Sequence, residues 1–143
     1  EVDFSDTSFD PFSAQVVREG TDATIVAYGP LVPVALAAAE AAVEDGRSIE
    51  VIDLRSISPL DVPTVAASVA KTGRLIVAHE APTFGGMGGE LAAAITERCF
   101  YSLQAPVIRV GGYYMPYPVS RVEEEYVPDI DRILEAVDRA FDY

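Results

Sequence analysis

The strongest constraint on the fold is an alternation between short apolar runs and longer segments with helical periodicity. Four apolar runs, rich in Val, Ile and Leu, span residues 23–28, 49–54, 74–78 and 106–110. Runs of this length and composition are typical of strands that are buried on both faces. Helical patterns fill the intervals, over residues 31–45, 61–73 and 90–100. Parallel strands with right-handed crossovers are therefore expected, with helices on both faces of the sheet.

Capping residues support these helix boundaries. Gly46 stands where a helix over residues 31–45 would end. Asp61 is expected to be the N-cap of a helix that stops at Gly73. Asp129 is expected to cap a last helix, whose apolar residues recur at helical spacing as Ile130, Ile133, Leu134, Val137 and Phe141.

The first part of the chain has a different character. Residues 1–20 sustain neither a helical nor a strand period, so we expect a linker or arm there and a folded domain over 21–143. Phe4, Phe9 and Phe12 are expected to hold this arm against another surface. The segment is acidic and polar, unlike a secretory signal peptide.

The charge balance limits the classes of partner. The formal net charge is -13, which disfavours nucleic acid and anionic membrane surfaces, because both are bound through Lys and Arg. Plain solubility and attraction of a basic protein partner both remain open. The single cysteine, Cys99, has no partner for an internal disulfide, and no apolar run reaches the ~18 residues of a membrane span. A cytoplasmic, bacterial protein is expected.

A glycine-rich stretch, GGMGG at residues 85–89, lies between a predicted strand and a predicted helix. Backbone N–H groups of Gly88 and Gly89 could bind a phosphate at such a helix N-terminus. The stretch has neither dinucleotide nor phosphate-loop spacing, and it follows the third strand instead of the first. A tight turn with close backbone packing is the favoured interpretation.

His79 and Glu80 end the third predicted strand, where ligands of open α/β sheets often bind. A general base is one interpretation. The other is a pair that hydrogen-bonds neighbouring loops or a subunit interface. Because no recognisable nucleophile lies nearby and one His with one Cys does not complete a zinc site, we assign no catalytic residue and no metal ligand.

Two further surface features bear on partners. The glutamates at residues 123–125 precede an acidic C-terminal helix, which is either a solvated face or a surface that attracts a basic partner. Tyr113, Tyr114 and Tyr117 lie in a proline-rich loop over residues 111–118. Such a loop either packs on its own domain or supplies the aromatic contacts common in interfaces.

The string VIDLRSISPLD at residues 51–61 resembles the C-terminal domain of transketolase-like enzymes. It resembles most closely the beta subunits of pyruvate and branched-chain 2-oxoacid dehydrogenases. The resemblance extends over residues 16–143, through ordered matches at residues 19–26, 28–29, 71–74, 79–81, 86–90, 105–107, 109–110 and 116–118.

The resemblance implies a three-layer α/β fold with a mostly parallel, five-stranded sheet. The fifth strand is expected at residues 16–18 or after Gly112. It also implies oxidative decarboxylation of a 2-oxoacid, branched-chain or pyruvate, on thiamine diphosphate and Mg²⁺, with acyl transfer to a lipoyl group. The Gly-Asp-Gly cofactor motif and the catalytic Glu of the family do not occur here, so no cofactor residue is assigned and this chain alone is expected to be inactive.

The resemblance further implies that this domain is an assembly module. Its implied partners are its own pyrimidine-binding domain, the alpha subunit, a second beta subunit and the subunit-binding domain of the dihydrolipoyl acyltransferase. Gln104, in place of the acidic residue that family members often have, and the terminal carboxylate of Tyr143 are implied contacts of the acyltransferase. Together with Tyr113, Tyr114 and Tyr117 they form the predicted partner-binding set.

Two alternatives belong to other classes. One is a stand-alone flavodoxin-like domain that binds a small anion at residues 85–89. The other is a hydrolase centred on His79.

Overall fold

The computed structural model describes residues 10–143. It contains a five-stranded sheet in the order β1-β3-β2-β4-β5, with the strands β1 (Gln15–Arg18), β2 (Ala23–Ala27), β3 (Ile49–Asp53), β4 (Leu75–Pro82) and β5 (Ile108–Gly112). β1 pairs antiparallel with β3, and the other pairs are parallel. The expected α/β fold with a mostly parallel sheet is confirmed, and the first of the two positions considered for the fifth strand is correct.

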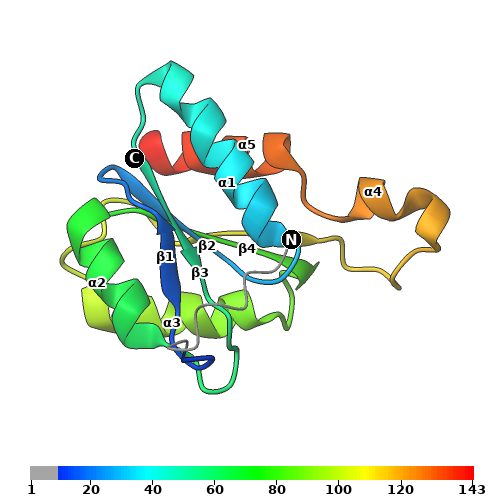
Figure 1. Cartoon of the computed structure of the whole chain (residues 1–143), viewed down its shortest axis with the longest axis horizontal. Helices are drawn as coiled ribbons and strands as arrows, with labels where there is room; N and C mark the ends of the chain where they lie inside the picture. The colour runs from blue at the N-terminus through cyan, green and yellow to red at the C-terminus, as the bar shows by residue number, and fades with distance from the viewer. Residues whose placement is uncertain (1–9) are drawn as a thin grey trace, which may run out of the picture.

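Helices cover both faces of the sheet. α1 (Leu31–Ala41), which continues as a 3-10 turn over Ala42–Asp45, lies with α5 (Ile130–Phe141) on one face. α2 (Val62–Thr72) and α3 (Met87–Cys99) lie on the other, as Figure 1 shows. No helix within residues 10–143 has the length and apolar character that crossing a membrane requires.

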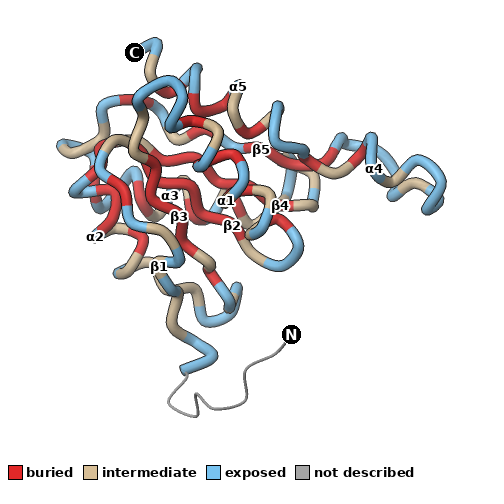
Figure 2. The backbone as a smooth tube through the Cα atoms, turned by 45° about the horizontal axis from the view of Figure 1, so that its top comes forward, coloured by how far each residue is buried: buried red, intermediate tan, exposed pale blue. Residues whose placement is uncertain are grey.

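The hydrophobic core is divided in two by the sheet. Side chains of one face, such as Ile25 and Ile76, pack with α1 and α5, and those of the other, such as Val26 and Val77, pack with α2 and α3. Adjacent strand residues point to opposite faces, so both sets of a central strand are buried. Figure 2 shows this as buried backbone along the central strands and exposed backbone around them.

Local signals in the sequence fix most helix ends. The Asp61 carboxylate accepts a hydrogen bond from Thr64 N–H at 3.2 Å, and Asp129 accepts one from Arg132 N–H at 2.8 Å. Gly73 ends α2 at a φ of 73°, which a residue with a Cβ adopts only with strain. α3 starts at Met87, earlier than the expected residue 90, so Gly88 and Gly89 belong to the helix and not to the turn before it.

The predicted arm over residues 1–20 includes β1, so the sheet begins inside it. The Ala14 N–H, just before β1, donates to the Asp61 carboxylate at 2.9 Å. This contact joins the segment to the start of α2. Phe12 is exposed, whereas Phe4 and Phe9 lie outside the described residues.

A polar network crosses the interior between β3 and α2. Glu50 is 1% exposed and accepts hydrogen bonds from Lys71, from Ser68 and, at 3.3 Å, from the Gly20 N–H. The Ser68 hydroxyl also bonds that of Thr24 at 2.6 Å. Burial alone would raise the pKa of Glu50, but these hydrogen bonds outweigh it and lower the pKa. The carboxylate is therefore kept ionised inside the fold.

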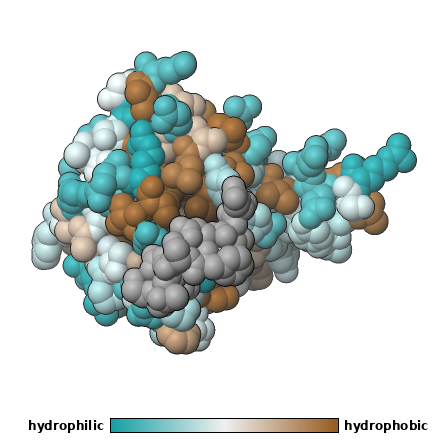
Figure 3. Space-filling model, in the orientation of Figure 1, coloured by the Kyte–Doolittle hydropathy of each residue, from teal (hydrophilic) through white to brown (hydrophobic). Residues whose placement is uncertain are grey.

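A segment between β5 and α5 projects from the body, as Figure 1 shows. It holds a short 3-10 turn (Ser120–Val122) and the short helix α4 (Glu123–Tyr126). On the face drawn in Figure 3, hydrophobic residues gather over the middle of the body, while the projecting segment is mostly hydrophilic.

Candidate functional site

The topological switch point lies between β2 and β4. The connection from β2 leads to β3 on one side of β2, and the connection from β3 leads to β4 on the other side. Ligands of open α/β sheets bind at the carboxyl ends of such strands. Here two rings meet there: those of Tyr28 and His79 are stacked, with centroids 6.0 Å apart. His79 and Glu80 lie within β4, which runs on to Pro82, beyond the expected strand end.

The hydrogen bonds of His79 define a structural role. Its side chain has no exposed surface. Nδ1 lies 2.8 Å from the Ala81 carbonyl oxygen, and Nε2 accepts a hydrogen bond from the Gly88 N–H at 3.3 Å. The ring is therefore neutral, with its proton on Nδ1. Burial lowers the pKa of His79, and the nearby Arg109 adds to this effect. Without solvent access His79 has no substrate proton to take, so the hydrolase hypothesis loses its base.

Two glycines of the glycine-rich stretch pack closely on β4. A Cβ on Gly88 would lie 2.5 Å from His79 Nε2, and one on Gly86 would lie 2.3 Å from the Pro82 carbonyl oxygen and 2.8 Å from His79 Cε1. Gly88 N–H donates to His79, and Gly89 N–H donates to the Gly86 carbonyl at 3.0 Å. Both donors considered for a phosphate are thus engaged, which counts against anion binding at residues 85–89. Close packing accounts for Gly86 and Gly88, whereas Gly85 lies in open space at a φ of +72°.

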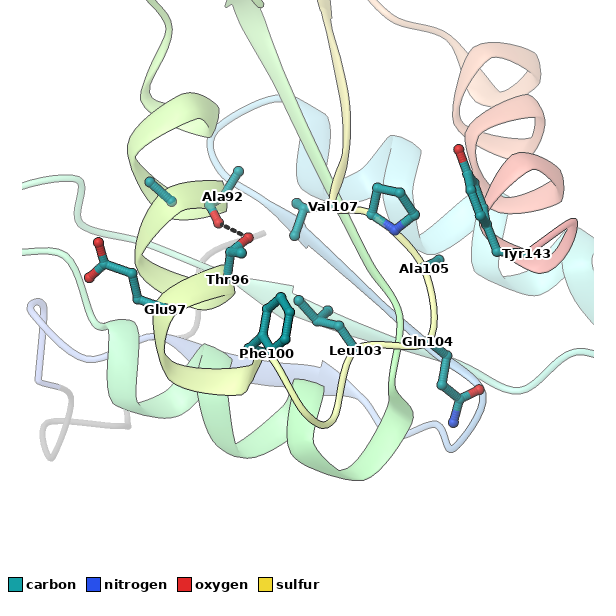
Figure 4. A pocket seen from close by; sticks show the side chains of 11 residues that line it. Ala92, Thr96, Glu97, Phe100, Leu103, Gln104, Ala105, Val107 and Tyr143 are labelled. Carbon is teal, nitrogen blue, oxygen red and sulfur yellow. Dashed lines mark hydrogen bonds between the residues drawn. The ribbon is translucent and has the colours of Figure 1, made fainter.

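An open apolar groove lies beside α3, with a volume of about 990 Å³. It lies between the second half of α3 and the loop that leads to β5. Its lining is mainly hydrophobic: Ala92, Ala93, Thr96, Glu97, Phe100, Leu103, Gln104, Ala105, Pro106, Val107 and Tyr143. Figure 4 shows Phe100, Leu103 and Val107 on its floor, with Tyr143 standing at the opposite wall.

Two predicted partner-binding residues, Gln104 and Tyr143, meet at this groove although they come from distant parts of the chain. Figure 4 shows the Gln104 side chain directed away from the hollow. It packs on the end of α2, where its Nε2 lies 2.7 Å from the position a Cβ on Gly73 would take. Tyr143 is 76% exposed and Phe100 is 64% exposed. The aromatic rings, more than Gln104, offer contact area here.

The three predicted tyrosines lie apart from the lining of that groove. Tyr114 packs edge-on against Phe84 with centroids 4.9 Å apart. The Tyr117 hydroxyl donates to Glu123, and this hydrogen bond raises the pKa of Tyr117 to about 12. The Arg132 guanidinium lies over the Tyr113 ring, with its Cζ 4.7 Å from the ring centroid. Each ring keeps more than half of its surface exposed, so the loop packs on its own domain and still presents aromatic area.

Sequence reasoning missed the apolar floor of the groove. The signal available in the sequence was the pair of adjacent aromatics Phe100 and Tyr101, just after α3. The structure shows that both are exposed, at a place where polar residues are the norm. A helical pattern alone does not separate such residues from core residues, because Cys99 beside them is buried.

The residues from 10 to 143 hold no group of three or more His, Cys, Asp or Glu placed to bind a metal ion. The switch-point crevice is occupied by the rings of Tyr28 and His79. The side chains of Tyr28 and His79 supply neither a carboxylate for Mg²⁺ nor a cationic group for a diphosphate at this place.

The comparisons with known proteins agree with one another. The family model "Transketolase, C-terminal domain" matches residues 13–133. The chain is 54% identical to the pyruvate dehydrogenase E1 component subunit beta of Leifsonia xyli, over all of this chain and 42% of that protein. It is 50% identical to the 3-methyl-2-oxobutanoate dehydrogenase subunit beta of Mycobacterium tuberculosis, over 88% of this chain and 36% of that protein.

A solved structure supports the same assignment. A split-gene transketolase, described as an inactive beta4 tetramer, superposes with a TM-score of 0.80 at 30% identity, over 99% of this chain and 45% of that one. The chain spans less than half the length of these relatives. The family model covers most of the chain. The chain belongs to the transketolase C-terminal domain family.

Proposed function

We propose that this chain is the C-terminal domain of the beta subunit of a thiamine-diphosphate-dependent 2-oxoacid dehydrogenase. Its role is to hold partners together and not to carry out the decarboxylation. Two relatives with at least half of their aligned residues identical are named as beta subunits of such dehydrogenases. Their names cover both pyruvate and a branched-chain 2-oxoacid, so the proposal extends to the reaction class and not to one substrate.

The observation that carries the assembly role is the open apolar groove beside α3. Exposed apolar concavities on soluble proteins are typical of surfaces that bind another protein. The exposed rings of Phe100 and Tyr143 add the aromatic character that interface centres have. We assign the groove to the subunit-binding domain of the dihydrolipoyl acyltransferase.

The charge of the chain suits this partner, which is basic in the family that the sequence resembles. The net charge is -13, and Glu97 lies at the edge of the groove. Charges at the rim mainly accelerate association, while the apolar floor supplies affinity. Salt should therefore slow association more than it speeds dissociation.

The tyrosine-rich projecting segment forms a second contact surface in this proposal. Tyr113, Tyr114 and Tyr117 each expose a large ring. They are assigned to contacts within the enzyme itself: with its own pyrimidine-binding domain, the alpha subunit or the second beta subunit. The cofactor supplies the carbanion chemistry when bound in the full enzyme, and no residue of this chain is given a part in that step.

A matched pair of tryptophan substitutions tests the groove. Ala93 is exposed and lines it, whereas Ala37 is exposed on α1, on the opposite face of the sheet. In the assembled enzyme, Ala93→Trp should weaken binding of the purified subunit-binding domain by about tenfold or more, because the indole fills the apolar floor. Ala37→Trp should leave binding unchanged.

Titration calorimetry at low and high ionic strength gives the measurement. Wild-type affinity for both tryptophan variants would remove the groove from the interface. Weakening by both variants alike would point to a general loss of structure, which thermal unfolding of each variant checks.

A further inference from the structure

Three arginines line a second, polar hollow at the edge of the sheet. Arg109 comes from β5, and Arg132 and Arg139 come from α5, which packs beside it. The hollow has a volume of about 310 Å³ and is closed by Thr83 and by Tyr113 and Tyr114. This size lies at the lower end of the range for small-molecule pockets.

The three arginines form no close ion pair with a carboxylate, although Glu135 also lines the hollow. The ion pairs within residues 10–143 involve Arg18, Arg47, Arg55 and Lys71. None joins Arg109, Arg132 or Arg139 to a carboxylate oxygen within 4.0 Å. The chain has a net charge of -13, with 23 acidic and 10 basic residues, and three of those basic side chains gather at this hollow.

Two of the guanidinium groups are held in place by neutral partners. Arg132 donates to the Gly111 carbonyl oxygen and, at 3.3 Å, to that of Tyr126, and its plane lies over the Tyr113 ring. Arg109 donates to the Thr83 carbonyl oxygen at 2.9 Å. Carbonyl oxygens orient a guanidinium without neutralising it, so these two groups are preorganised and still carry their full charge.

Arg139 completes the arrangement and remains free to move. It is exposed and makes no hydrogen bond or ion pair in the described part of the chain. With Arg109 it also lines an adjoining hollow of about 230 Å³. A ligand in the main hollow can therefore contact two fixed guanidinium groups while the third closes over it.

We propose that this hollow binds a small oxyanion of the phosphate class, either free phosphate or the phosphoryl group of a small metabolite. Guanidinium forks match the oxygen geometry of phosphate and form two parallel charge-assisted hydrogen bonds with it. The hollow also leaves room for a small organic group. This site is separate from the docking groove beside α3, and its test does not depend on the proposed docking.

Glu135 gives the proposal an internal check. Its side chain lines the same hollow, between Arg132 and Arg139 on α5, but forms no ion pair within 4.0 Å with either. A carboxylate in this place repels an entering oxyanion. Glu135→Gln should therefore tighten phosphate binding, whereas loss of an arginine should weaken it.

The experiment is a calorimetric titration of the purified protein with inorganic phosphate at constant ionic strength, set by chloride. Arg139→Gln is the main variant, because it removes no hydrogen bond of the fold. It should weaken phosphate binding by about tenfold, the effect of one charge-assisted hydrogen bond. The matched control is Arg98→Gln, since Arg98 is exposed on α3 and lines neither hollow. It should bind phosphate as the wild type does.

A phosphorylated three-carbon acid, titrated in parallel, distinguishes the two sources of the anion. Tighter binding than inorganic phosphate assigns the hollow to a metabolite, and equal binding assigns it to the free ion. The proposal is overturned if phosphate does not saturate the wild-type protein, or if Arg98→Gln weakens binding as much as Arg139→Gln. Saturation by an acidic peptide but not by phosphate would also overturn it, and would make the hollow a protein contact.

Discussion

Two adjacent glycines at the start of α3 should respond to alanine in opposite directions. Gly88 and Gly89 occupy the first turn of the same helix, so the gain in helix propensity on replacement by alanine should be similar at both. They differ in what a Cβ would meet. At Gly88 it would lie 2.5 Å from His79 Nε2, and at Gly89 its nearest neighbour would be Arg109 Nη1 at 3.4 Å. A separation of 3.4 Å is close to an ordinary van der Waals contact, so the Arg109 side chain needs to move little or not at all.

The magnitudes follow from these two distances. Alanine gains up to about 1 kcal/mol over glycine in a helix, and Gly89→Ala should keep most of this gain. Gly88→Ala should lose it, because forcing a buried ring aside costs about 1–3 kcal/mol and endangers the Gly88–His79 hydrogen bond. The net expectation is a loss of about 1–2 kcal/mol, which is a fall of ~3–6 °C in Tm for a chain of this size.

Urea denaturation followed by circular dichroism measures both variants. In the His79→Ala background the ring is gone, so Gly88→Ala should no longer destabilise relative to that background. Equal effects of Gly88→Ala and Gly89→Ala in the wild-type background would refute the conclusion that contact with His79 requires glycine at residue 88.

Three other predictions concern titration, the buried network and the cofactor. Because the pKa of His79 is lowered from 6.5, the unfolded chain binds more protons, and the free energy of unfolding should fall as pH drops below about 6.5. His79 is the one histidine of the chain, so urea denaturation from pH 5 to 8 should show this slope in the wild type and not in His79→Gln. Lys71→Met should lower the free energy of unfolding by about 2 kcal/mol, because it leaves Glu50 buried without its cation. This is less than the ~3–5 kcal/mol of fully buried pairs, since the Lys71 side chain is 44% exposed. Adding Glu50→Gln to this variant should restore stability. Thiamine diphosphate with Mg²⁺ should leave the Tm of this chain alone unchanged, and a dose-dependent rise would contradict the assembly role.

The elements that sequence reasoning located correctly are those with local causes. The strands β2 and β3 are short β-branched runs, and each is buried along nearly its whole length. The caps at Asp61 and Asp129 depend on backbone groups three residues away, and the turn at Gly73 depends on its own φ. Such signals lie within a few residues and can be read without knowledge of the fold.

The features that were missed or left open depend on contacts between distant segments. β1 was one of two positions expected for the fifth strand, and its own residues did not decide between them, because it exposes two of its four residues and pairs on one edge only, with β3. The glycines at residues 86 and 88 are explained by β4, through His79 at Gly88 and through Pro82 and His79 at Gly86. Gln104 lies at the predicted surface, but its side chain is turned toward Gly73 by the close approach of the loop to α2.

Two aromatic rings lie at the switch point of the sheet, and the candidate binding sites lie elsewhere. In many open α/β sheets the crevice between the diverging strands holds the ligand, but here the rings of Tyr28 and His79 occupy it. The two concavities to which binding roles are assigned flank β5, at the edge of the sheet: the groove before it and the arginine hollow beside it. They adjoin through a smaller hollow that shares Tyr143 with the groove and Arg139 with the arginine hollow. With these two rings at the switch point, both concavities lie at the edge of the sheet, where a partner or ligand can reach them.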